Sequence, residues 1–134
     1  MTADITLPPA TKSPRTITLP IATDEELAAV VPGAWTAPTF LNGWINFGAP
    51  YAPAAYRKVG DIVFLRGLLK GGAFGAAAFQ LPAGFRAPYD LFFAVPNNDQ
   101  YGSLAVTAAG NVQPNSPPST TWVDLAGVQF SITT

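Results

Sequence analysis

The sequence contains neither cysteine nor histidine. Without cysteine there are no disulfides, no thiolate metal ligands and no cysteine nucleophiles. Without histidine, serine catalysis lacks its usual general base, and a zinc site would have to consist of carboxylates alone, which is uncommon for that metal. We therefore expect no metal site, no cofactor and no nucleophilic catalysis.

Charged residues are scarce too. They make up 11% of the 134 residues, against about a quarter in an average soluble domain, while hydrophobic residues reach 49%. A small monomer with so few charges would expose much of its apolar surface. We therefore expect identical chains to bury part of that surface between them. The net charge of −1 is spread along the chain and gives no electrostatic footprint for nucleic acid, which we exclude as a partner.

Long apolar runs are missing as well. No stretch approaches the roughly 20 residues that a membrane-spanning helix needs, so we expect no membrane insertion. The first residues include Asp4, Pro8 and Pro9, which do not fit the charged start and apolar centre of a secretory signal. We therefore expect a protein made in the cytoplasm without a signal peptide.

Residues 1–33 are predicted to form an extended amino-terminal arm. The sequence ITLP at 5–8 returns at 17–20, and the prolines around both copies prevent a continuous helix. Apolar residues without a core of their own suit strands that add to the edge of another surface, although a disordered tail stays an alternative. The candidate attachment residues are Ile5, Leu7, Ile17 and Leu19.

A short helical turn is expected at the end of this arm. Thr23 and Glu26 have the spacing of a capping box, and the acidic side chains between them favour a helix start. Pro32 and Gly33 then end the turn. This pattern predicts either a hinge or a plain linker between the arm and the domain beyond it.

Residues 34–134 have the pattern of an all-β domain, an antiparallel β-sandwich of jelly-roll type. Short runs of β-branched and aromatic residues alternate with glycine and proline turns. Ala109, Gly110 and Asn111 predict a tight hairpin, whereas 96–102 and 114–121 predict loops. The expected strands are 39–41 leading into 44–47, then 55–58, 62–69, 77–81, 91–95, 103–108, 111–113 and 122–133.

Six segments of this domain follow one another in a recognisable order. They are LNGWINFG at 41–48, YAPAAYRK at 51–58, GDIVFLRGLLKGG at 60–72, FQLPAGFRAP at 79–88, GNV at 110–112 and WVDLAGVQF at 122–130. In this order they resemble a domain found at the carboxyl-terminal ends of bacteriophage tail-fibre and minor tail proteins. The resemblance covers about residues 34–134 and excludes the arm. It implies a β-sandwich head, typically trimeric, that binds a receptor or decorates the virion.

The resemblance also implies a function and a location. The expected protein is a non-enzymatic phage surface component, a short trimeric tail fibre or part of the baseplate, made in the host cytoplasm and placed on the tail, baseplate or capsid. Its head would bind a host cell-surface saccharide or protein, and its arm would hold other virion proteins. The alternative is a decoration protein of the capsid or baseplate, a cement or head-fibre protein with a purely structural role.

Binding residues are predicted from aromatic and polar side chains. Loops on a rigid scaffold carry recognition, so the candidate ligand-binding residues are Tyr51, Asn97, Asn98, Asp99 and Tyr101. Other large side chains, several of them in predicted strands, are expected in the core or between subunits. These are Trp35, Trp44, Tyr56, Arg86 and Trp122.

Catalysis has a single possible route in this inventory. The acids of the predicted head are Asp61, Asp90, Asp99 and Asp124, and a glycosidase needs two carboxylates roughly 5 to 9.5 Å apart. Each aspartate lies near a turn or at an exposed strand position, where it ordinarily caps or is solvated. An enzyme would require two of the four to meet in an open cleft. Asn97, Asn98 and Asp99 could offer oxygen atoms to calcium, but the EF-hand spacing is missing and a turn is expected.

Overall fold

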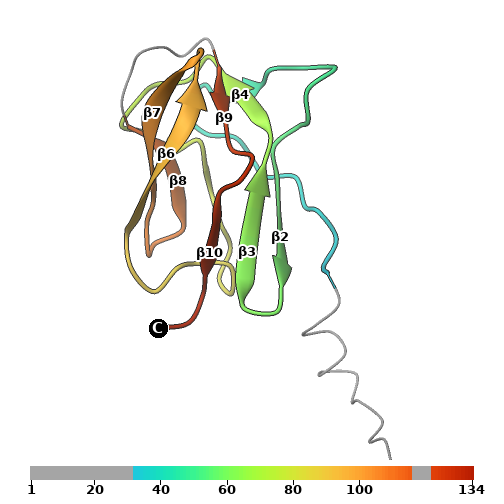
Figure 1. The fold of residues 1–134 in the computed structure, drawn as a ribbon, viewed down its shortest axis with the longest axis vertical. Helices are drawn as coiled ribbons and strands as arrows, with labels where there is room; N and C mark the ends of the chain where they lie inside the picture. Colours follow the sequence, from blue (N-terminus) through green and yellow to red (C-terminus); the bar gives the residue numbers. More distant parts are fainter. Residues whose placement is uncertain (1–31, 116–121) are drawn as a thin grey trace, which may run out of the picture.

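The head is an antiparallel β-sandwich, seen in a computed structural model that describes residues 32–115 and 122–134 (Figure 1). Within these ranges every strand pairing is antiparallel and no helix occurs, so the predicted all-β class is confirmed. Nothing there has the length and apolar character of a membrane-crossing helix. The predicted attachment residues and the capping box at Thr23 lie outside the described residues.

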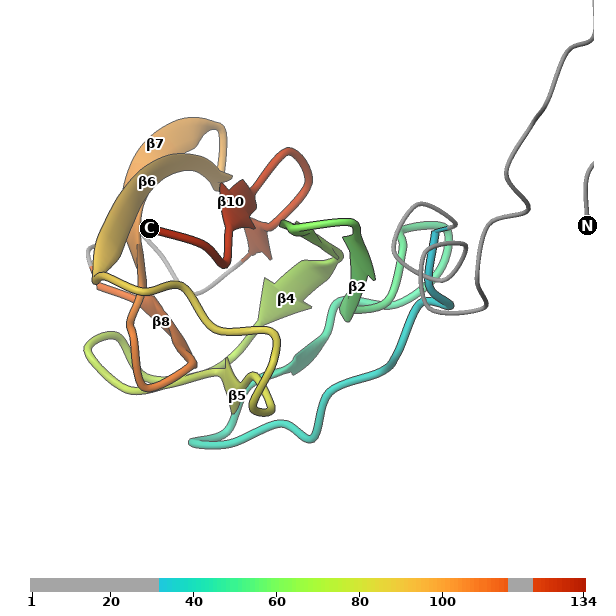
Figure 2. The same cartoon turned by 90° about the horizontal axis from the view of Figure 1, so that it is seen from below.

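In the described ranges ten strands form two sheets. The three-stranded sheet has the order β10 (Gln129–Ser131), β3 (Ile62–Arg66), β2 (Ala55–Val59). The seven-stranded sheet has the order β1 (Ile45–Asn46), β4 (Leu68–Lys70), β9 (Val123–Asp124), β6 (Leu91–Asn97), β7 (Gln100–Val106), β8 (Asn111–Pro114), β5 (Phe79–Gln80). Figure 2 shows the large sheet curling around the interior.

One continuous core lies between the sheets. Inward positions on paired strands alternate with outward ones, as on β6, where Val95 and Asn97 are buried while Phe92, Ala94 and Pro96 are exposed. The largest fully buried apolar side chains are Trp44, Phe79, Leu69, Leu81, Leu104 and Leu125. Burying each of these side chains stabilises the fold by roughly 1.5–3 kcal/mol.

Trp44 is anchored by the segment that comes after β4. It is 1% exposed, and its indole Nε1 donates to the Ala73 carbonyl at 3.2 Å. A Cβ on Gly72 would lie 2.2 Å from the indole ring, so only glycine lets the backbone approach this closely. The glycine-rich stretch after β4 is therefore a packing surface for this tryptophan.

Two predicted strands are each divided in the structure. The run 62–69 breaks at Gly67 into β3 and β4, and the run 122–133 breaks around Gly127 into β9 and β10. Both segments thereby pass from one sheet to the other at the same place, joined by a hydrogen bond from Leu125 N to Gly67 O at 2.9 Å. Gly67 has φ +120°, and a Cβ there would lie 2.4 Å from Ala54 Cα, so glycine is required.

The prediction of a loop at 96–102 is wrong. β6 and β7 continue through it and pair down to Asn97 and Gln100, which leaves a two-residue turn. The turn residues Asn98 and Asp99 have φ of 48° and 64°, and asparagine and aspartate are the side chains that tolerate such angles in tight hairpins. Proline is accepted at position 96 because β9 pairs with β6 only at Asn97.

Other boundaries differ less. No strand forms at 39–41, because Asn42 and Gly43 turn the chain with positive φ. This segment bonds to the run 77–81 through Leu41 N to Ala78 O and Asn42 Nδ2 to Ala77 O, and that run is reduced to β5. The hairpin predicted around Gly110 is confirmed. It joins β7 to β8, with Gly110 N donating to Thr107 O at 2.8 Å.

Candidate functional site

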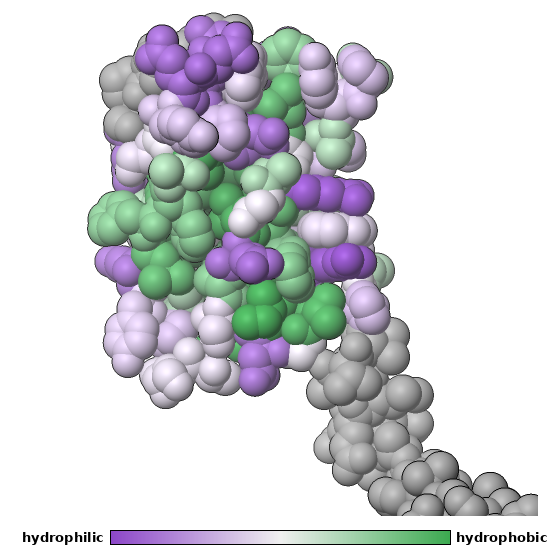
Figure 3. Space-filling view, in the orientation of Figure 1, coloured by the Kyte–Doolittle hydropathy of each residue, from purple (hydrophilic) through white to green (hydrophobic). Residues whose placement is uncertain are grey.

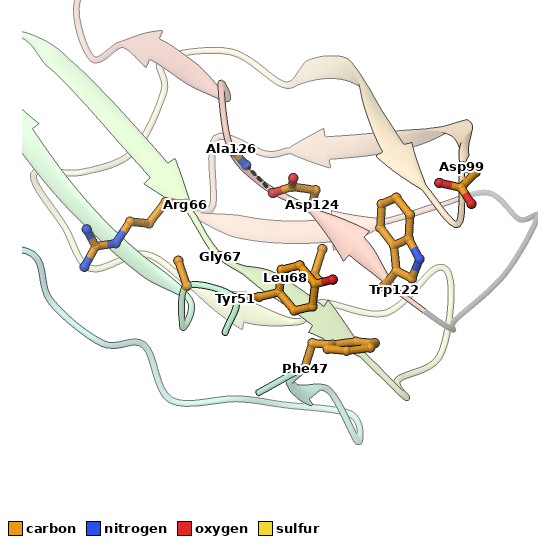
Figure 4. A pocket seen from close by; sticks show the side chains of 10 residues that line it. Phe47, Tyr51, Arg66, Gly67, Leu68, Asp99, Trp122, Asp124 and Ala126 are labelled. Carbon is orange, nitrogen blue, oxygen red and sulfur yellow. Dashed lines mark hydrogen bonds between the residues drawn. The ribbon is translucent and has the colours of Figure 1, made fainter. Parts of the chain in front are cut away.

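A pocket of about 500 Å³ opens at the end of the sandwich where β4 lies beside β9 (Figure 4). Its floor includes Gly67 and Leu68, so the crossing between the sheets lies directly beneath it. Segments far apart in the sequence supply the rim. The large or acidic side chains on this rim are Phe47, Tyr51, Asp99, Trp122 and Asp124, whereas Arg66 lines the pocket but its guanidinium points away from them (Figure 4).

One side of the pocket is an aromatic pair on the segment after β1. The rings of Phe47 and Tyr51 meet edge to face, with centroids 5.3 Å apart, and Tyr51 is 53% exposed. A backbone bond from Phe47 N to Leu68 O ties this segment to β4, and one from Tyr51 N to Gly48 O closes a turn within it. Lys70 places its ammonium 5.1 Å from the Phe47 ring centroid. Phe47 is thus engaged within the chain, and Tyr51 offers the freer ring.

The opposite side is formed by Trp122, which directly precedes β9. Its half-buried indole stands across the opening from Tyr51 and Phe47 (Figure 4). Broad apolar faces with polar tips on two sides of a cavity suit a flat ligand that carries both C–H and O–H groups. This arrangement can stack a ring between the two aromatic walls.

Two carboxylates supply acceptors on the same rim. Asp99 is exposed at the β6–β7 turn and has no side-chain hydrogen bond within the described residues. Asp124 accepts a hydrogen bond from Ala126 N at 2.9 Å, which closes the turn toward β10 and orients the carboxylate (Figure 4). Both can accept hydrogen bonds from ligand hydroxyls.

Asp99 and Asp124 line the same pocket, as a two-carboxylate hydrolase would need. The environment of the two carboxylates does not favour hydrolysis. The general acid of a glycosidase sits in an apolar environment, whereas Asp99 stands in solvent at a hairpin tip. In the view of Figure 4 the Trp122 indole lies between the two carboxylates. Among the described residues no group of three or more potential metal ligands occurs.

The structure separates the predicted ligand-binding residues. Tyr51 and Asp99 line the pocket, but Asn97 is 1% exposed and Asn98 serves the turn. Tyr101 is 79% exposed on the outer face of β7, in a shallow depression with Phe92. Prediction from sequence missed Phe47 and Asp124. Asp124 could have been found, because it comes two residues after Trp122 and so shares its side of a strand.

The residues predicted for core or subunit contacts are also divided. Trp44 and Tyr56 are buried, and Tyr56 packs edge to face on Phe85 at 5.2 Å. Arg86 is bonded within the chain, from its Nε to Leu81 O at 2.9 Å. Trp122 belongs to the pocket, and Trp35 is half-buried outside the core.

No protein-family model matches the chain, and no curated protein matches it in sequence. Among solved structures, the fold is similar to that of the receptor binding protein (gp15) of Listeria phage PSA, with a TM-score of 0.65 and 16% sequence identity. The similarity covers 80% of this chain and 68% of that chain. At this identity, the likeness establishes a shared β-fold.

Proposed function

We propose that this chain is a bacteriophage virion surface protein whose head binds a receptor on the host cell. Its sequence motifs resemble those of tail-fibre and minor tail proteins, and its fold is similar to that of a phage receptor binding protein. We place it in a short tail fibre or a baseplate. Residues 1–33 then fasten the head to other virion proteins.

The observation that carries this role is the pocket between Tyr51 and Trp122. A volume of about 500 Å³ falls in the range of small-molecule sites. Such a pocket can hold a sugar ring more readily than it can hold the flat surface of a protein receptor. A saccharide ring would stack on the two aromatic walls, while Asp99 and Asp124 accept its hydroxyl hydrogens. The ligand class proposed is therefore a host-surface saccharide. Weak single sites gain avidity when several heads are displayed together.

The test is binding of the purified full-length chain to an array of bacterial cell-wall and capsular oligosaccharides. We expect at least one saccharide to bind, and Trp122→Ala to weaken its binding about tenfold or more, since a lost stacking contact of about 1.4 kcal/mol corresponds to that factor. Tyr89→Ala is the matched control, because Tyr89 is 62% exposed and lies outside the pocket. Equal binding by both variants would remove the pocket from the proposal.

A role in decoration predicts a different result. A cement or head-fibre protein would bind no saccharide on the array, and deleting it would reduce particle stability without changing host adsorption. That pair of results would replace the receptor-binding proposal.

We propose that the head binds without hydrolysis. Asp124 is held by its own turn, and Asp99 is exposed. The oligosaccharide that binds best should therefore be recovered intact after prolonged incubation with the native chain. Release of shorter products, abolished by Asp99→Asn, would make the chain a hydrolase.

We propose a homotrimer, with the outer face of β6 and β7 as one contact surface. Neither strand has a charged side chain, and Phe92 and Tyr101 are 73% and 79% exposed. Apolar surface gathers over these strands (Figure 3). Interface centres are enriched in aromatic residues and depleted of charge. Light scattering should give a mass of three chains, reduced by Phe92→Glu; a mass of one chain for the native protein would contradict the trimer.

A further inference from the structure

A stack of three planar side chains lies on the outer face of the small sheet. The guanidinium carbons of Arg57 and Arg66 lie 4.5 and 4.2 Å from the centroid of the Trp35 ring. The register explains the meeting, because Ala55 pairs with Arg66 and Arg57 with Phe64, which puts both arginines on one face. Hydrophilic side chains can be seen along this edge of the molecule in Figure 3, over β2.

Trp35 reaches this place because its segment runs along the free edge of β2. Gly33 N donates to Lys58 O at 3.0 Å, and Thr36 N donates to Tyr56 O at 2.8 Å. Trp35 therefore lies beside Arg57. Trp35 lies three residues after Pro32, the first described residue, so the stack is close to the place where residues 1–31 join the head.

The two cations of the stack have no acidic counterpart within 32–115 and 122–134. No ion pair joins either of them to an aspartate there, and both Nε atoms are buried without a hydrogen-bond partner. A guanidinium lying flat on an indole gains cation–π energy but leaves its outer N–H groups for other acceptors. Two such groups held on one ring repel each other, so a carboxylate-rich partner would stabilise them.

The strongest acidic run of the sequence is tethered close by. Asp24, Glu25 and Glu26 are consecutive and account for three of the eight acidic residues. Glu26 precedes Trp35 by nine residues. A fully extended chain of that length spans up to about 30 Å, so the carboxylates can reach the stack with length to spare. Tethering also raises their effective concentration there.

We propose that the stack of Arg57, Trp35 and Arg66 is a docking site for the acidic residues Asp24, Glu25 and Glu26 of the same chain. Carboxylates would bind the outer N–H groups of the two guanidiniums in the bidentate manner that arginine favours. The contact sets the direction in which the arm leaves the head. It is independent of saccharide binding at the pocket.

The test is an NMR titration of the Glu25 and Glu26 side-chain carboxyl carbons in the full-length native chain. Docking should lower their pKa by about one unit from the ordinary value of about 4.3, because each lies beside an opposite charge. Replacing both arginines, as Arg57→Gln with Arg66→Gln, should restore the ordinary value. Lys70→Gln, which removes a cation that contacts Phe47 instead, should leave the lowered value unchanged.

Two further measurements separate the outcomes. The triple change Asp24→Asn, Glu25→Gln and Glu26→Gln leaves the described fold untouched and should shift the Nε–H signals of Arg57 and Arg66. In a mixture of carbon-13-labelled double-arginine variant and unlabelled native chain, the labelled carboxyls should keep ordinary values; lowered values would assign the docking to a neighbouring copy. Identical titrations in the native and double-arginine chains, with unmoved Nε–H signals, would overturn the proposal.

Discussion

The sheet crossing and the pocket rim are adjacent but differ in what holds them. At the crossing, Gly67, Ala54 and Leu125 are buried, and backbone atoms approach too closely for any other residue at 67. On the rim, Tyr51 and Asp99 are exposed. We therefore expect stability to depend on the floor and the proposed recognition on the rim, so that the rim can vary without loss of the fold. Substitutions in both regions test that separation, from the largest effect to the smallest.

Gly67→Ala should break the floor. The new Cβ would lie 2.4 Å from Ala54 Cα, and φ of +120° adds backbone strain, so we expect the free energy of unfolding to fall by about 4 kcal/mol or more. Urea unfolding monitored by tryptophan fluorescence measures this. Gly127→Ala is the control, because its φ is +88° but nothing lies within 4 Å of the added Cβ. It should cost only about 1 kcal/mol; equal losses would refute the steric argument.

Trp44→Ala and Trp122→Ala should give opposite profiles. Trp44 is 1% exposed in the core, so its removal should cost about 3–5 kcal/mol of unfolding free energy. Trp122 is half-buried on the rim, so its removal should cost much less stability and should instead weaken the proposed saccharide binding. Denaturation and array binding of both variants measure the contrast. A rim variant as unstable as the core variant would show that the rim also supports the fold.

Asp99→Gly should move stability and binding in opposite directions. Asp99 has φ of 64° at the second position of the two-residue turn, where glycine is preferred, so unfolding free energy should rise by about 0.5 kcal/mol. The same change removes a carboxylate from the rim and should weaken saccharide binding several-fold. Asp99→Asn separates the two effects, since it keeps a residue that tolerates this turn but removes the charge. Unchanged binding in both variants would take Asp99 out of the site.

Local patterns predicted the fold class well. Alternation and turn residues located β2, β6, β7 and β8 close to their observed positions. The two divided strands were not visible, because hydrophobic alternation continues through Gly67 and through Gly127 although the chain changes sheets there. The hydrophobic pattern of one strand does not show that its pairing partner changes from one sheet to the other.

The hairpin at Asn98 was missed because the proline, asparagines and aspartate of 96–102 were interpreted together as a loop. Pro96 is nevertheless accommodated in β6, because the neighbouring strand β9 is short and pairs with β6 only at Asn97. The pocket could be predicted only in part. Tyr51 and Asp99 were singled out separately, but nothing local indicates that they share a rim, since their meeting depends on the pairing of β4, β9 and β6. Long-range pairing also explains why Tyr101 was misplaced with them.

The pairing of the last strands has a consequence for synthesis. β9 and β10 are made after all the others, yet β9 connects β4 to β6, and β10 pairs with β3. Until they leave the ribosome, β3 and β4 each lack a neighbour on one side, and the edges of both are open to other nascent chains. The head must therefore complete its folding after these residues emerge, whereas residues 1–33 have long been available. A partner that held the arm at that stage would be present before the head was closed.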